Sequence, residues 1–84
     1  MRIKFEAVDK NGKPHKRASV SRLYSHCVVI HFAGRAPNKF WPRGVEAYSR
    51  AQWAGTRELA ERSAGRWRKE PSVDAIEILE ARQV

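Results

Sequence analysis

The clearest hydrophobic pattern in the chain is an alternation near its start. Ile3, Phe5 and Ala7 alternate with charged residues, and the pair Asn11-Gly12 follows a few positions later. This pair best tolerates the positive φ angles of a two-residue hairpin turn, so the pattern predicts a β-hairpin. Folding the chain about Asn11-Gly12 would place Lys10 opposite Lys13, Glu6 opposite Arg17, Phe5 opposite Ala18 and Ile3 opposite Val20.

Residues 23–33 are rich in β-branched and aromatic side chains and predict a second kind of strand. Alternation separates the apolar residues into two sets: Tyr24, Val28, Ile30 and Phe32 on one face, and Leu23, Cys27 and Val29 on the other. A strand that is apolar on both faces is typical of the centre of a sheet. Because the same alternation would place Arg22 on the core face, we expect a bulge or bend between Val20 and Tyr24.

The second half of the chain predicts one clear helix. Residues 45–53 are ambiguous, since alternation favours a strand and their Ala, Glu and Gln content favours a helix; we favour a strand. Thr56 is a good helix N-cap, and a stripe at helical spacing follows it: Leu59, Ala60, Ser63, Ala64 and Trp67. Gly65 inside this helix indicates a close approach to the sheet. Pro71 ends the helical region, and residues 73–81 predict a last strand.

These elements predict one α+β domain over residues 1–84. Its sheet would be small and mostly antiparallel, with one main helix packed on one face, in the order β-β-β-α-β or, if residues 45–53 are helical, β-β-α-α-β. The other face would be solvated, plugged by the Gly- and Pro-containing loop at residues 34–44, or used in an interface. Because the central strand is apolar on both faces, we expect a homodimer through the uncovered sheet face or a protein partner.

Composition narrows the class of protein. With 42% hydrophobic residues, the chain has enough apolar side chains to fold and is not of the disordered class. One cysteine cannot form an internal disulfide, and the first ten residues lack the apolar stretch of a signal peptide. The longest apolar run, residues 27–30, is too short to cross a bilayer. We therefore expect a cytoplasmic protein with no membrane association.

The net charge of +8 is concentrated in one part of the chain. Between Asp9 and Glu46 there are eight basic residues and no acidic one, which favours a polyanionic partner: nucleic acid, an acidic protein surface or a nucleoprotein complex. Phe40 and Trp41 lie among these residues and could stack on an unpaired base if exposed, or could instead plug an open sheet face. The candidate binding residues are Lys13, Lys16, Arg17, Arg22, Lys39, Phe40, Trp41 and Arg43.

The stretch "YSHCVVIHF" (residues 24–32) carries two histidines and the cysteine, and suggests chemistry. On a strand, His26 and Cys27 point to opposite faces, and Cys27 and His31 lie about 13 Å apart at 3.3 Å per residue. This strand alone therefore cannot supply two ligands to a zinc ion, whose ligands lie about 2.0 to 2.3 Å away. We interpret Cys27 as a small core residue and predict no metal, no cofactor and no catalytic residue.

Three short motifs carry a resemblance: "YSHCVV", "WAGTRELAERSA" and "IEILEA", which together span about residues 24–81. They resemble a loose group of small, mostly uncharacterised proteins of phages and bacterial mobile elements, which share a Tyr-Ser/Thr-His-x-Val-Val strand and a Trp-x-Gly start to a Leu-Ala helix. The resemblance implies a phage accessory protein acting in a bacterial host cell. No activity or functional residue carries over from it.

Three hypotheses follow. The leading one is a non-enzymatic basic module that binds nucleic acid or a nucleoprotein complex. The second is a phage-encoded protein inhibitor of a host defence enzyme, anti-CRISPR-like in role, which docks through an apolar sheet face. The third is a small metal-independent ribonuclease toxin, in which His26 or His31 near Arg17 or Arg22 acts as a general acid or base.

Overall fold

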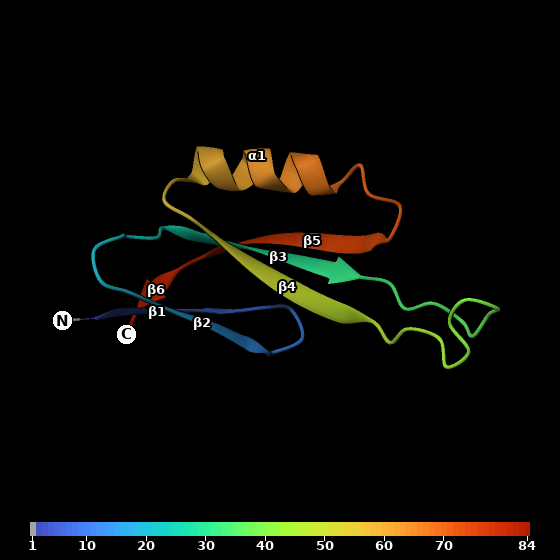
Figure 1. Ribbon diagram of the computed structural model, residues 1–84. Coiled ribbons are helices and arrows are strands. Elements are labelled where there is room, and N and C mark those ends of the chain that lie inside the picture. The colour runs from blue at the N-terminus through green and yellow to red at the C-terminus, as the bar shows by residue number, and fades with distance from the viewer. Residues whose placement is uncertain (1) are drawn as a thin grey trace.

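The computed structural model describes residues 2–84, which form a helix and two sheets stacked in three layers (Figure 1). The helix covers one face of a central sheet of order β4-β3-β5, and a second sheet of order β2-β1-β6 covers the other. In chain order the elements are β1 (Ile3–Val8), β2 (Pro14–Ser19), β3 (His26–Phe32), β4 (Tyr48–Ala54), α1 (Arg57–Trp67), β5 (Val73–Glu80) and β6 (Arg82–Gln83).

β3 is the central strand, as its pattern predicts, and it is antiparallel to both neighbours. Val28, Ile30 and Phe32 face the helix and pack with Ala60 and Ala64. Cys27 and Val29 face the second sheet and pack with Ala7. The two apolar faces of β3 therefore belong to two separate cores, one on each side of the central sheet.

The α+β class and the single helix on one face are confirmed, and the order is β-β-β-α-β followed by the short β6. The ambiguous segment at residues 45–53 contains a strand, as favoured, but this strand begins only at Tyr48. One expectation about layers is wrong. The N-terminal hairpin does not extend the central sheet but forms, with β6, a sheet of its own that lies over the face opposite α1. That face is not uncovered, so it does not offer the homodimer surface expected from the sequence.

The predicted hairpin exists, but its register is shifted by one residue. Ile3 pairs with Ser19, Phe5 with Arg17 and Ala7 with His15. The loop is closed by the Asp9 and Lys13 backbone and has Gly12 at φ +78°, whereas Asn11 has no positive φ. This three-residue loop, with a left-handed glycine at its last position, replaces the predicted two-residue turn. Because a one-residue slip exchanges the faces of a strand, His15 points into the protein and Val20 is exposed.

The chain between β2 and β3 bends, as Arg22 predicts, and β3 begins only at His26. Tyr24 consequently lies between the two sheets rather than on the helix-facing side. Its ring packs edge-on against Phe5, with ring centroids 5.4 Å apart, and lies 6.1 Å from the ring of Trp53.

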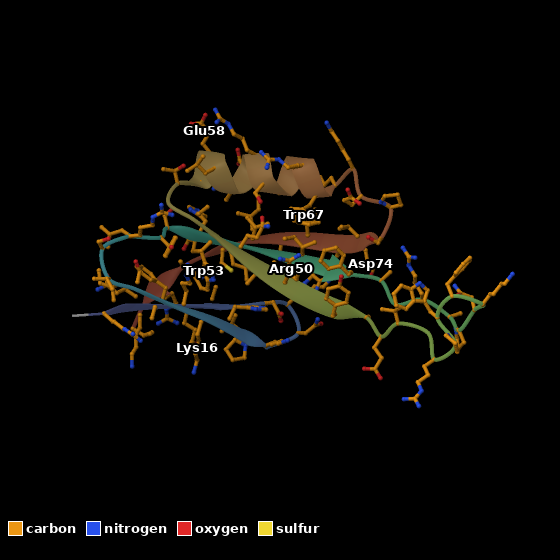
Figure 2. The ribbon with its side chains drawn as sticks, in the orientation of Figure 1. Lys16, Arg50, Trp53, Glu58, Trp67 and Asp74 are labelled. Atoms are coloured by element: carbon orange, nitrogen blue, oxygen red, sulfur yellow. The ribbon has the colours of Figure 1, made fainter. Side chains whose placement is uncertain are left out.

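The helix begins where the sequence predicts and ends at Trp67, the last residue of the predicted stripe and four residues before Pro71. Thr56 is the N-cap, and its side chain accepts a hydrogen bond from the backbone N–H of Leu59 at 3.2 Å. Trp67 lies between the helix and the central sheet, edge-on to Phe32 (Figure 2). The close approach expected at Gly65 is absent, because a Cβ atom there would meet no atom within 4 Å. Across the described residues 2–84, no helix has the length and apolar character needed to cross a membrane.

Candidate functional site

Between β3 and β4 the chain leaves the sheets as a loop that projects beyond one end of the molecule (Figure 1). Its base is closed by two backbone hydrogen bonds between Arg35 and Val45, of 2.7 and 2.9 Å. Its tip is a turn of residues 38–44, here called the aromatic turn. The Asn38 side chain accepts hydrogen bonds from the backbone N–H groups of Phe40 and Trp41, at 2.9 and 2.8 Å. The turn is therefore shaped by its own hydrogen bonds.

Gly44 allows the loop to close. It has φ +71°, and a Cβ atom at this position would lie 2.6 Å from the Arg35 carbonyl oxygen. Any larger residue would have to push the two arms of the loop apart. Gly44 thus lets the two arms of the loop lie close together at the base of the aromatic turn.

These side chains are open to solvent. Phe40 is 82% exposed and Trp41 51% exposed, and both Lys39 and Arg43 are exposed beside them. The alternative that Phe40 and Trp41 plug a sheet face is wrong, because the helix and the second sheet cover the two faces of the central sheet. Two aromatic rings and two cations therefore share one projecting turn.

The remaining predicted binding residues are exposed as well, but they do not join this turn. Lys13 and Lys16 lie on the N-terminal hairpin, and Lys16 points away from the central sheet (Figure 2). Arg17 lies on the opposite face of β2, with its guanidinium carbon 5.9 Å from the centre of the Tyr24 ring. Arg22 lies in the β2–β3 connection, at the end of the molecule remote from the aromatic turn (Figure 1). The structure thus divides the predicted patch into separate basic regions.

Few of the basic side chains are neutralised. Among the described residues, Arg57 and Arg62 are the only Lys or Arg side chains in a salt bridge, and both pair with glutamates on α1. Two further acidic residues, Asp9 and Glu77, pair with histidines in the interior. The surface around the hairpin and the loop is therefore more basic than the net charge alone suggests.

A polar network that sequence reasoning missed lies between the two sheets. It consists of Asp9, His15, His31, Ser49 and Glu77, and is called here the inter-sheet network. His31 is hydrogen-bonded through Nδ1 to Ser49 Oγ at 2.7 Å and through Nε2 to Glu77 Oε2 at 2.6 Å. The backbone N–H of Lys10 donates to the other oxygen of Glu77. The network thus ties the hairpin turn to β3, β4 and β5.

Asp9 is the deepest member of this network, with a side chain that is 1% exposed. Its Oδ2 accepts a hydrogen bond from His15 at 2.9 Å, and its Oδ1 accepts from the backbone N–H groups of Asn11 and Lys13. The bond from His15, with those from the two amides, holds the pKa of the Asp9 carboxyl below its ordinary value of 3.8. Asp9 is therefore ionised although it is buried. The sequence signal for it was the Asp-x-x-Gly spacing of a turn.

The residues of the "YSHCVVIHF" stretch do not meet in one site. Cys27 is fully buried, and burial raises the pKa of its thiol to about 12, so it is an unreactive core residue. His26 is half-buried and bonded through Nδ1 to Ser25 Oγ. Both ring nitrogens of His31 are engaged by protein groups. A ribonuclease step at His31 would require one of these two bonds to break first.

Comparisons with models of known protein families, with curated proteins and with solved structures found no match. Function must therefore be argued from the aromatic turn, the basic surface and the inter-sheet network themselves.

Proposed function

We propose that this protein is a non-enzymatic module that binds single-stranded nucleic acid, with the aromatic turn as its principal contact. The observation that carries this proposal is the exposure of Phe40 and Trp41 between Lys39 and Arg43, on a turn held by hydrogen bonds to Asn38. Aromatic side chains that are not needed for the core cost solubility. A turn that holds two of them out beside cations fits a ligand with flat rings and negative charge.

The two parts of the turn have separate roles in this proposal. Phe40 and Trp41 stack on unpaired bases, which contributes about 1 to 3 kcal/mol per base and does not depend strongly on sequence. Lys39 and Arg43 neutralise the neighbouring phosphates and release counterions. A duplex hides its base faces, so single strands are the preferred ligands. The hairpin cations Lys13 and Lys16 would extend the phosphate contacts along the molecule.

The experiment compares the wild type with the double variant Phe40→Ala/Trp41→Ala. Fluorescence anisotropy with labelled single-stranded and duplex DNA and with single-stranded RNA measures the affinities. We expect the wild type to prefer single strands and the variant to bind them at least about tenfold more weakly, because each lost stacking contact is worth about a factor of five or more in Kd. Neither substitution removes a buried side chain, so the unfolding temperature should hardly change.

The charge contribution has a matched control. Lys39→Ala/Arg43→Ala and Arg66→Ala/Arg68→Ala each remove two exposed positive charges, the first pair from the loop and the second from the end of α1. Only the loop variant should weaken binding and reduce the salt dependence, by about 0.7 in the log–log slope for each lost phosphate contact. Equal losses in both variants, or wild-type binding that does not respond to salt, would contradict the proposed site.

A second candidate function rests on a different surface. Leu23 is 67% exposed and lines, with Leu59 and Tyr24, a hollow of about 480 Å³ near the start of α1. Exposed leucines around a hollow favour a protein partner, as the hypothesis of a phage-encoded inhibitor requires, although the sheet face which that hypothesis invoked is covered. Nuclease treatment of a host lysate before co-purification separates the two candidates, because a partner bound through nucleic acid is lost.

A further inference from the structure

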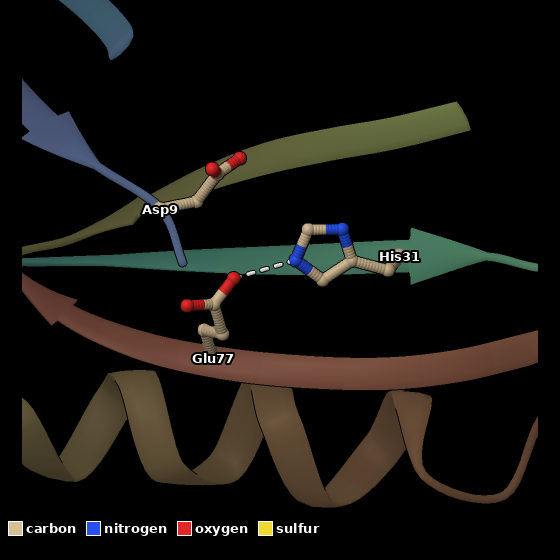
Figure 3. Close-up of side chains that lie close together, drawn as sticks. All are labelled: Asp9, His31 and Glu77. Atoms are coloured by element: carbon tan, nitrogen blue, oxygen red, sulfur yellow. Dashed lines mark hydrogen bonds and ion pairs between the residues drawn. The ribbon is translucent and has the colours of Figure 1, made fainter. Parts of the chain in front are cut away.

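Three side chains of the inter-sheet network lie close together, although they come from distant parts of the chain (Figure 3). Asp9 lies in the hairpin turn after β1, His31 on β3 and Glu77 on β5. Each offers one oxygen or nitrogen atom, and the three atoms all lie within 4.8 Å of one another. Two carboxylates and an imidazole are thus held together between the sheets.

The charge at this point is unusual for so basic a protein. Asp9 and Glu77 have side chains that are 1% and 17% exposed, and within residues 2–84 neither forms a salt bridge with any lysine or arginine. Two carboxylates brought close together away from water repel each other and lose hydration. Among the described residues, the side-chain partners of these two carboxylates are histidines. A bound cation would balance the two negative charges.

The surrounding contacts hold the imidazole and the two carboxylates in place. When His31 carries its proton on Nδ1 and donates it to Ser49 Oγ, Nε2 presents a lone pair toward Glu77. His15 and two backbone amides hold the Asp9 carboxylate, and the Lys10 amide holds that of Glu77. Such outer contacts fix ligand orientation and imidazole tautomer in metal sites.

We propose that Asp9, His31 and Glu77 bind one divalent first-row transition ion, with Zn²⁺ as the best-fitting example. The imidazole favours such an ion over Mg²⁺ or Ca²⁺, which prefer oxygen alone. Bonds of about 2.0 to 2.1 Å to a tetrahedral ion place ligand atoms about 3.3 Å apart. His31 Nε2 and Glu77 Oε2 would therefore separate by about 0.7 Å from their present contact. The ion takes the place of the proton between them.

Three protein ligands leave one position of a tetrahedral ion for water. A hollow lined by Lys10, Asn11, His31 and Ser49 reaches the cluster at His31, and the ion and this water would enter through it. The proposal is independent of nucleic-acid binding, because the aromatic turn contributes no residue to the cluster.

The test uses the full chain after treatment with a chelator. Zn²⁺ is titrated by isothermal calorimetry, with Mg²⁺ as comparison, and thermal unfolding is measured with and without the ion. We expect one Zn²⁺ per chain, a raised unfolding temperature and no comparable effect of Mg²⁺. Glu77→Gln removes a ligand with little change of shape and should weaken Zn²⁺ binding at least tenfold. Glu80→Gln on the same strand is exposed, removes the same charge and should bind like the wild type.

A measurement on the wild type tests the proposal even if the variant fails to fold. In an NMR spectrum that detects imidazole nitrogens, stoichiometric Zn²⁺ should move the Nε2 signal of His31 and leave that of His26 in place. Equal Zn²⁺ affinity of the wild type and Glu77→Gln, an unchanged His31 signal, or loss of binding in His26→Ala but not in Glu77→Gln would overturn the proposal.

Discussion

At the scale of single residues, burial decides which of the polar side chains can reach a ligand. His15 and His31 point into the protein and hold carboxylates, whereas Lys16, one position after His15, is exposed on the other side of β2. Cys27 lies fully buried between Trp53 and Leu79, its cross-strand neighbours. Two of the side chains that looked most chemical in the sequence, Cys27 and His31, are therefore buried.

Cys27 gives a direct test of this arrangement. With its pKa raised to about 12 by burial, the native thiol carries almost no thiolate at pH 9, whereas a thiol at the ordinary value of 9.0 is half ionised. We expect iodoacetamide to alkylate the native protein at pH 9 more than about a hundredfold more slowly than the protein unfolded in guanidinium, as measured by mass spectrometry.

The control for this experiment moves the thiol to the surface. Ser21→Cys in a Cys27→Ala background places a cysteine at an exposed position and should react at a similar rate in the native and unfolded protein. A native wild-type chain that reacts as fast as this variant would show that Cys27 is not buried as described.

At the scale of elements, local sequence patterns predict individual helices and strands well, but they do not predict how the strands pair. Alternation identified β3, and the Thr56 cap with its apolar stripe identified α1, because both depend on neighbours in the chain. The hairpin register was missed because the Asp9 carboxylate and a left-handed Gly12 set a three-residue loop. No local pattern says which strands share a sheet, so the second sheet could not be predicted either.

Glycine-to-alanine substitutions test the helix and the hairpin turn, and they should change the free energy of unfolding in opposite directions. Gly65→Ala lies inside α1, where a Cβ meets open space, and should raise the free energy of unfolding by about 0.5 to 1 kcal/mol. That corresponds to an unfolding temperature about 2 to 8 °C higher in a chain of this size. Gly12→Ala also meets no atom, but φ is +78° there, so it should destabilise the protein by about 1 to 2 kcal/mol. Thermal and urea unfolding measure both; the same sign for the two would contradict the described turn.

The two candidate sites also differ in how far they could be predicted from the sequence. Lys39, Phe40, Trp41 and Arg43 are close in sequence, so composition alone could find the aromatic turn as a candidate, although not decide its exposure. Asp9, His31 and Glu77 are 22 and 46 residues apart along the chain and meet only through the packing of two sheets. Considering one strand at a time excluded a metal on β3 and could not see ligands that arrive from other strands.

At the scale of the whole molecule, the basic regions are spread over an elongated body whose longest dimension is 48 Å. The aromatic turn projects from one end, and the hairpin that carries Lys13 and Lys16 forms the lower layer in Figure 1. One ligand can reach both only if it is long enough to follow the surface. Affinity should therefore depend on the length of the nucleic acid.

The dependence of affinity on strand length can be tested by removing two pairs of cations in turn. Oligonucleotides of about 4 and about 16 nucleotides, the range bound by small single-strand modules, are compared by anisotropy. Lys39→Ala/Arg43→Ala should weaken binding of both lengths, whereas Lys13→Ala/Lys16→Ala should weaken binding of the longer one only, since a short strand held at the turn does not reach the hairpin. Equal sensitivity of the short strand to both variants would argue against separate regions.

The pairing of β1 with β6 also bears on how the protein folds. Phe5 lies beside Gln83, and the Val84 amide donates to the Lys4 carbonyl, so the N-terminal hairpin acquires its third strand from the other end of the sequence. Contacts between such distant residues form slowly, because closing a long loop costs entropy before the contacts stabilise the chain. During synthesis, β1 can pair with β6 only after nearly all of residues 1–84 have left the ribosome. Leu79 of β5, which packs against the same core as Ala7, leaves almost as late, so the apolar face of the hairpin stays partly open to chaperones until then.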